Sequence, residues 1–110
     1  MYFKEYINAC KRTYTFQGHP KIDTGLICMG LAGETGEVID YLKKVHFQGH
    51  ELNKEKLISE MGDMMWYFAM LCYFYNIKFE DILNKNIEKL KLRYPDGFDT
   101  QKSINRESEE

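Results

Sequence analysis

The stretch from residue 33 to residue 63 constrains the fold most strongly, because two pairs of carboxylates recur in it at helical spacing. The pairs are Glu34 with Glu37, and Glu60 with Asp63. Residues three apart on a helix project from the same side. Apolar residues around each pair recur every three or four positions, which predicts an amphipathic helix in both places. Each helix is therefore expected to present two carboxylates beside an apolar stripe.

Five apolar residues define each stripe. The first stripe comprises Ile27, Leu31, Val38, Leu42 and Val45, and the second comprises Leu57, Met61, Met64, Phe68 and Tyr75. Glu34 falls inside the first stripe, and Glu60 lies at the border of the second. An unpaired carboxylate that faces a core is costly and tends to protonate. Four such groups suggest a cation between the helices, and oxygen ligands suit Mg²⁺ or Mn²⁺.

The alternative is that these carboxylates are simply solvated. Charged residues make up 29% of the chain, and many acidic pairs at this spacing lie on exposed helix faces. Two pairs that both border apolar stripes weigh against that alternative. On these residues alone, a metal site and a solvated face both remain open.

The sequence predicts four helices and no convincing strand. The expected ranges are Tyr2 to about Phe16, Asp23 or Thr24 to about His46, Asn53 to about Tyr75, and Phe79 or Glu80 to Arg93. Glycine or proline stops three of these helices: Gly18 and Pro20 follow the first, Gly49 the second, and Pro95 and Gly97 the fourth, whereas the third is followed by a turn at residues 76–79. The expected fold is all-α, a four-helix bundle-like protomer. We expect a single domain over residues 1–98 and a polar C-terminal tail over residues 99–110.

The second helix contains three glycines, Gly30, Gly33 and Gly36. Each costs roughly 1 kcal/mol in a helix interior. We therefore expect compensation from close helix approach or from room for a ligand. The third helix is apolar nearly all round, with Trp66, Met70 and Tyr73 opposite its main stripe. Such a helix is buried on both sides, which predicts an oligomer whose interface includes this second face.

Composition excludes several classes of protein. A net charge of −2 over 110 residues provides no basic field for nucleic acid. No apolar run reaches the length of a membrane span, and the N-terminus lacks a signal-peptide pattern. Cys10, Cys28 and Cys72 are expected to be reduced core thiols. Together these features predict a cytoplasmic protein that binds neither nucleic acid nor membrane.

On the fourth helix, Asn86, Lys89 and Arg93 share a face. Two cations and an amide would suit a polyphosphate. The alternative is a solvated basic flank, which the helix dipole favours at a C-terminus. Both interpretations remain open from these residues.

The residues as a set resemble MazG-like nucleoside triphosphate pyrophosphohydrolases. The resemblance rests on Glu34-x-x-Glu37 followed by Glu60-x-x-Asp63, and it covers roughly residues 26–98. Its further segments are Gly30–Val38, Lys43-Lys44, Phe47–His50, Glu60–Tyr67 and Asn86–Phe98. There are two departures: Gly33 replaces a second acidic residue found in some members, and Gln48 replaces a histidine. The first departure leaves the four carboxylates intact.

The resemblance implies an all-α homodimer or homotetramer that uses Mg²⁺, with Mn²⁺ as an alternative, to hydrolyse a (d)NTP to the monophosphate and pyrophosphate. By position, the implied metal ligands are Glu34, Glu37, Glu60 and Asp63. Glu37 is also the implied catalytic residue, because a water can reach it at the edge of the stripe. The implied substrate-binding residues are Lys44, Tyr67, Asn86, Lys89, Arg93 and Tyr94. Trp66 is expected to point away from this side, into the core or an interface.

Two other functions remain open. One is a non-catalytic helical module that binds a nucleotide or a partner; the full set of four carboxylates argues against it. The other is a related enzyme of the same superfamily, such as a dUTPase-like or phosphoribosyl-ATP pyrophosphatase enzyme. The expected role is cleaning of the nucleotide pool.

Overall fold

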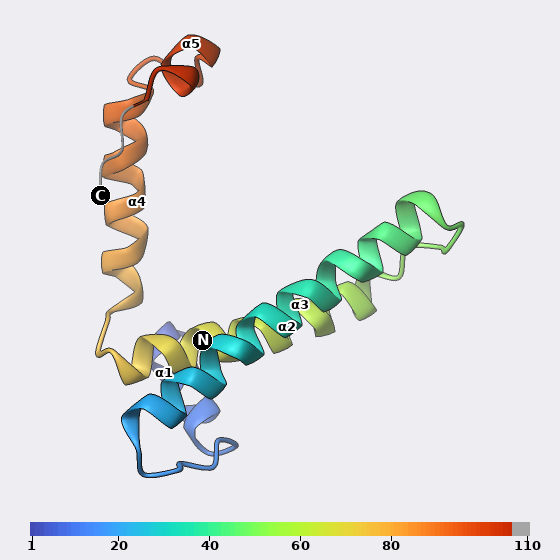
Figure 1. Ribbon diagram of the computed structural model, residues 1–110, viewed down its shortest axis with the longest axis vertical. Coiled ribbons are helices and arrows are strands. Elements are labelled where there is room, and N and C mark those ends of the chain that lie inside the picture. Colours follow the sequence, from blue (N-terminus) through green and yellow to red (C-terminus); the bar gives the residue numbers. More distant parts are fainter. Residues whose placement is uncertain (107–110) are drawn as a thin grey trace. The chain divides into compact units, whose positions relative to one another are not determined.

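The computed structural model describes residues 1–106, and they are almost entirely helical where they form regular structure. The helices are α1 (Phe3–Lys11), α2 (Pro20–Phe47), α3 (Lys54–Phe74), α4 (Phe79–Arg93) and α5 (Thr100–Ile104) (Figure 1). Within residues 1–106 there is no strand, only an isolated bridge between Pro95 and Gly97. The prediction of an all-α fold is confirmed, with five helices instead of four.

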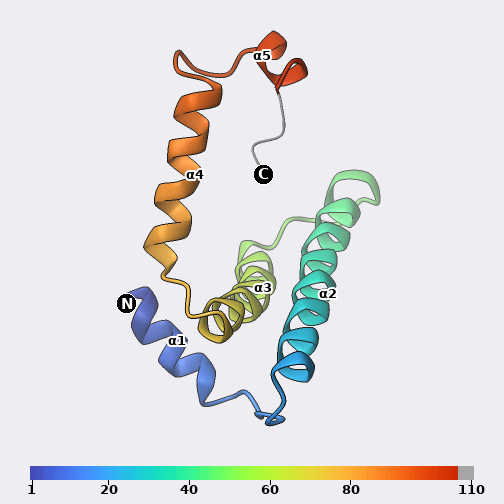
Figure 2. The ribbon, with the colours of Figure 1, turned by 60° about the vertical axis from the view of Figure 1, so that its left-hand side comes forward.

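The chain divides into two compact units, one from Met1 to Asn76 and one beginning at Ile77. In the first unit, α2 and α3 form a long antiparallel hairpin, and α1 packs against α3. Figure 2 shows α2 and α3 side by side from a second direction. The second unit contains α4 and α5. The bundle of four helices and the domain limit at residue 98 stay predictions, and residues 107–110 of the predicted tail lie outside the described residues.

The first helix is shorter than predicted, because it ends at Lys11 and not near Phe16. The Thr13 hydroxyl donates to the Cys10 carbonyl at 3.1 Å and so occupies one of the free carbonyls at the helix end. Tyr14 leaves the helical path and donates from its hydroxyl to the Asp23 carboxylate. Side-chain bonds to the end of the helix and to α2 therefore replace the last predicted turn.

The second helix begins earlier than predicted, at Pro20. Proline is well suited to a first helical position, because its φ angle is preset and its missing N–H needs no partner there. Asp23 is therefore not the cap; it lies buried one turn inside the helix. Its carboxylate accepts from the Tyr14 hydroxyl and from the Gln17 amide at 2.9 Å. The Tyr14 hydrogen bond holds the pKa of Asp23 below its usual value, and the bonds tie the connection before α2 to the helix.

The remaining helix limits agree with the sequence. Asn53 caps α3 as predicted, with its side-chain oxygen accepting from the Lys56 amide at 3.3 Å. The α4 limits are those predicted, and Gly97 adopts a φ of 95° in the turn that follows. Part of the predicted polar tail forms α5, which Asp99 caps by accepting from the Lys102 amide at 3.0 Å.

The core of the first unit lies between α1 and α3 and between α3 and α2. Its buried cluster comprises Cys10, Ile27, Ala69 and Met70. The predicted stripe on α3 is partly wrong, since Met61 is 47% exposed and Tyr75 is 59% exposed. The apolar residues of α1 pack instead against the face of α3 that was expected to lie opposite the main stripe. Trp66 and Met70 of that face thus pack within the chain, whereas Tyr73 is 37% exposed, and the oligomer stays a prediction.

The expectation of three core thiols is wrong at one position. Cys10 and Cys72 are buried, but Cys28 is exposed, and all three cysteines are free. Cys28 follows Ile27 on α2 and therefore projects in a different direction from the core residue. No helix among the described residues is long and apolar enough to cross a membrane.

Candidate metal centre and nucleotide pocket

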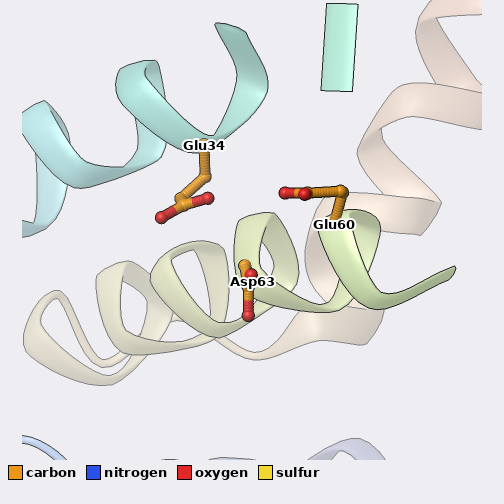
Figure 3. A group of neighbouring side chains, drawn as sticks. All are labelled: Glu34, Glu60 and Asp63. Atoms are coloured by element: carbon orange, nitrogen blue, oxygen red, sulfur yellow. The ribbon is translucent and has the colours of Figure 1, made fainter. Parts of the chain in front are cut away.

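Three carboxylates from two helices converge on one point. Glu34 comes from α2, and Glu60 and Asp63 come from α3 (Figure 3). One oxygen of each lies within 4.8 Å of one oxygen of each of the others. Glu34 and Glu60 are half-buried, whereas Asp63 is exposed. Glu34 therefore forms one acidic cluster with two carboxylates that lie 26 and 29 positions further along the chain.

Tyr41 sets the register that brings these helices together. Its buried hydroxyl accepts from the Asn53 amide at 2.8 Å, at the point where the chain turns back into α3. Tyr41 lies seven positions after Glu34, and Asn53 lies seven positions before Glu60. Seven helical residues rise about 10 Å. The two glutamates therefore lie at the same height along the hairpin.

The cluster is electrostatically unbalanced. Burial raises the pKa of Glu34, and the negative charges of Asp63, Glu60 and Glu37 raise it further. Among residues 1–106, no lysine or arginine forms an ion pair with Glu34, Glu60 or Asp63. Converging carboxylates without a positive partner repel one another and favour binding of a cation.

The donor set fits a hard divalent cation. All three side chains offer oxygen atoms, which Mg²⁺ and Mn²⁺ prefer, and no sulfur or imidazole ligand is among them. Mg²⁺ usually keeps several waters and takes only a few protein carboxylates. Glu34, Glu60 and Asp63 would hold the ion and leave positions for water or substrate.

Beside the carboxylates lies an open pocket of about 390 Å³. It is lined by Thr13, Glu34, Asp63, Trp66 and Tyr67. Tyr67, an implied substrate-binding residue, lines the same pocket as Glu34 and Asp63, and its contact with a substrate stays a prediction. The expectation for Trp66 is only half right, because it packs against the core and also lines this pocket. The chain thus places two aromatic side chains directly beside an acidic cluster.

The glycines of α2 have different surroundings. A Cβ on Gly30 would overlap the Tyr67 ring, so the absence of a side chain there lets Tyr67 pack against the backbone of α2. Gly33 and Gly36 have open space around the position of a Cβ. Close approach therefore explains Gly30, and no contact within residues 1–106 explains the other two.

The model of the MazG nucleotide pyrophosphohydrolase domain matches residues 25–98. The chain belongs to this family. The Gene 37 protein of Mycobacterium phage L5 is 32% identical over 75 residues, which are 64% of this chain and 66% of the phage protein. The chain thus matches just under two thirds of that relative. No solved structure gives a significant match. The resemblance inferred from the sequence is confirmed.

Glu37 of this MazG domain lies apart from the three converging carboxylates. It is exposed on α2, and it is not among the residues whose oxygens meet within 4.8 Å. Its charge nevertheless raises the pKa of Glu34, so it lies near enough to act on the cluster. Its assignment as a ligand and as the catalytic residue stays a prediction.

The predicted phosphate-binding residues of the MazG domain belong to both units, Lys44 to the first and the others to the second. Lys44 pairs with Asp40 at 3.1 Å, and Lys43 pairs with the same carboxylate at 3.0 Å. In the second unit, Asn86 and Lys89 line one pocket of about 600 Å³ on α4. Arg93 ends α4, and the Tyr94 ring lies 5.2 Å from that of Phe98. Contact of these five predicted residues with a substrate stays a prediction.

Two further residues near the carboxylates lie before the matched MazG region and were not predicted. Thr13 lines the pocket, and the negative charge of Asp63 acts on the pKa of the Tyr6 hydroxyl. Burial, the Cys10 thiol and Asp63 together raise the pKa of Tyr6 to about 12. Both residues belong to the N-terminal segment that packs on α3. The sequence predicted this segment only as a helix, and nothing in it indicates a site.

Proposed function

We propose that this MazG domain is a Mg²⁺-dependent nucleoside triphosphate pyrophosphohydrolase. The observation that carries the proposal is the convergence of Glu34, Glu60 and Asp63 with no positive partner among the described residues. A triphosphate brings several negative charges, so it would bind beside these carboxylates only with divalent cations. Mg²⁺ is the preferred ion in this proposal, and Mn²⁺ is the alternative.

The proposed reaction is attack of water on the α-phosphorus of a (d)NTP. A bond forms between the water oxygen and the α-phosphorus, and the bond from that phosphorus to the oxygen bridging to the β-phosphate breaks. Pyrophosphate leaves with the bridging oxygen, the (d)NMP remains, and the water gives up a proton. A bound divalent cation supplies neutralisation of phosphate oxygens and lowers the pKa of a coordinated water.

The proposal assigns metal-binding, catalytic and substrate-binding roles to different residues. Glu34, Glu60 and Asp63 hold the metal, and Glu37 orients the water or accepts its proton as a fourth carboxylate. Tyr67 packs on the sugar or base. The proposed phosphate contacts are Lys44, Asn86, Lys89 and Arg93, and Tyr94 belongs to a segment that closes over the substrate.

We also propose a cytoplasmic homodimer or homotetramer that cleans the nucleotide pool. Large apolar side chains remain exposed on the α2–α3 hairpin, including Met29 at 68%, Ile39 at 62% and Ile58 at 61%. A second copy of the chain would remove them from water.

Product analysis tests the proposal. The purified protein is incubated with Mg²⁺ and each of a panel of NTPs and dNTPs in ¹⁸O-labelled water. We expect monophosphate and pyrophosphate, with the label in the monophosphate, and no reaction after chelation. Label in pyrophosphate would contradict attack at the α-phosphorus. Release of nucleoside diphosphate and inorganic phosphate would contradict it too. Glu60→Gln serves as the inactive control, and Glu51→Gln, in an exposed loop, serves as the matched active control.

The second function that the sequence left open is a binding module without turnover. It would show Mg²⁺-dependent binding of nucleotides and no product with any of them. The same incubations, followed by equilibrium dialysis of the unreacted nucleotide, separate it from the enzyme.

A further inference from the structure

We propose that Thr13 is a positioning residue that holds Trp66 as the base-stacking wall of the nucleotide pocket. This inference rests on the proposed function and deepens it. It assigns a role to the N-terminal segment, which lies outside the matched residues 25–98. The residues that carry it are Thr13, Trp66 and the neighbours that hold the indole.

The Thr13 hydroxyl makes two hydrogen bonds. Its oxygen accepts from the Trp66 indole N–H at 2.9 Å and donates to the Cys10 carbonyl at 3.1 Å. A threonine hydroxyl has one proton to donate, and an indole has one donor and no acceptor. The two bonds therefore form a short chain from the C-terminal end of α1 to α3. This chain fixes the orientation of the indole ring.

Aromatic neighbours hold the same ring from other directions. The Tyr67 ring lies 4.9 Å from the Trp66 ring at an interplanar angle of 81°, and the Tyr14 ring lies 6.1 Å away at 42°. Tyr14 is in turn bonded to buried Asp23. Trp66 thus lies in a rigid frame, which lowers the entropy lost when a ligand packs against it.

The position of Trp66 suits a nucleobase. Trp66 and Tyr67 line the same pocket as Glu34 and Asp63, so an aromatic surface adjoins the proposed phosphate-and-metal region. Aromatic side chains bind bases by stacking, and stacking tolerates any base because every base has a π-face. A nucleotide with its phosphates at the carboxylates would place its base toward this wall.

The engaged N–H of Trp66 determines how that wall recognises a base. Because Thr13 already takes the one donor of the indole, Trp66 offers ring surface and no hydrogen bond. Discrimination between bases by buried polar groups is strong only when such groups are left unpaired by the wrong ligand. We therefore infer that Trp66 contributes affinity for purine and pyrimidine nucleotides alike.

The test uses Thr13→Val, which keeps the shape of the side chain and removes the acceptor. With each nucleoside triphosphate we expect KM to rise about fivefold, the loss typical of one hydrogen bond, while kcat changes less than about twofold. Inhibition by inorganic tripolyphosphate should stay unchanged, because that probe has no base. Thr13→Ser keeps the hydroxyl and should behave as the wild type.

A second variant separates positioning from folding. Trp66→Phe keeps an aromatic ring but has no N–H for Thr13 to hold. In that background Thr13→Val should have no further effect on KM. An unchanged KM for Thr13→Val alone would overturn the proposal. So would an equal loss of tripolyphosphate inhibition, or an effect of Thr13→Val that persists in Trp66→Phe.

Trp66 is the only tryptophan in the chain, so its fluorescence reports binding without turnover. Titration with AMP and with UMP should quench it in the wild type, with weaker binding of both in Thr13→Val. Quenching without any hydrolysis of triphosphates would refute the proposed enzymatic activity and support nucleotide binding in the pocket. Hydrolysis with no effect of Thr13→Val on KM or on quenching would refute the role of Thr13 alone.

Discussion

The backbone N–H of Asn53 donates to the Tyr41 hydroxyl at 2.8 Å, and this bond aligns the two halves of the acidic cluster. Each of these residues lies seven positions from a clustered glutamate, Tyr41 from Glu34 and Asn53 from Glu60. Lys56 adds a contact, with its ammonium 4.8 Å from the centre of the Tyr41 ring. The geometry of the candidate metal centre therefore depends on a contact two helical turns away.

We expect Tyr41→Phe to destabilise the first unit. The substitution leaves the Asn53 amide without its acceptor, which costs about 1 kcal/mol and lowers Tm by about 5 °C. Urea and thermal unfolding measure the change. Tyr75→Phe is the matched control, because Tyr75 is 59% exposed. Equal stability of the two variants would show that the Tyr41 hydroxyl contributes nothing to the hairpin.

Glu34→Gln should raise the stability of the metal-free protein and abolish its response to Mg²⁺. It removes a carboxylate that burial and three neighbouring negative charges disfavour. Thermal unfolding in a chelator, and then in excess Mg²⁺, gives both quantities. If Mg²⁺ binds the folded state as proposed, it should raise the Tm of the wild type. A Mg²⁺-dependent rise of equal size in Glu34→Gln would exclude Glu34 as a ligand.

The contribution of Glu34 to the free energy of unfolding of the metal-free protein should decrease as pH rises. Because the pKa of Glu34 lies above its ordinary value of 4.5 in the folded protein, the folded state binds more protons than the unfolded state between the two pKa values. Stability decreases with pH in that window and levels off above it. Urea unfolding in chelator across this acidic range measures the slope. The component should be absent from Glu34→Gln, while Mg²⁺ binding should strengthen as pH rises through the same range.

Glu37→Gln should abolish turnover and leave the fold intact. The residue is exposed, so an amide in its place disturbs no packing, while the proposed general base or ligand is lost. Product formation and circular dichroism in chelator test the two halves of the prediction. A Glu37→Gln protein that unfolds without metal would indicate a structural role for the residue.

Gly30→Ala and Gly33→Ala should change stability in opposite directions. An added Cβ on Gly30 overlaps the Tyr67 ring, whereas one on Gly33 meets open space. Gly33→Ala therefore gains helix propensity, up to about 1 kcal/mol. Gly30→Ala gains the same propensity but must displace Tyr67, and overpacking of this kind costs about 1–3 kcal/mol. Thermal unfolding compares the pair. A Gly30→Ala protein as stable as Gly33→Ala would show that Tyr67 moves aside at no cost.

The sequence predicted the helical class and most helix limits because each signal was local. Asn53 has a capping side chain, and apolar residues on α2 recur at helical spacing. The limits failed where side chains distant in the chain intervened. Asp23 resembles a cap in the sequence, but in the structure it binds the Tyr14 hydroxyl and the Gln17 amide. A pattern based on neighbouring residues contains no information about such a bond.

The acidic residues of the site were evident from the sequence because spacing alone puts paired carboxylates on one side of each helix. The register between α2 and α3 was not, because it depends on Tyr41 reaching Asn53 across the hairpin. The wall of the pocket was not evident either. Thr13 and Trp66 are 53 positions apart, and only the packing of α1 on α3 brings the hydroxyl to the indole. Periodicity along one helix determines which residues share a face, whereas packing between helices decides which faces meet.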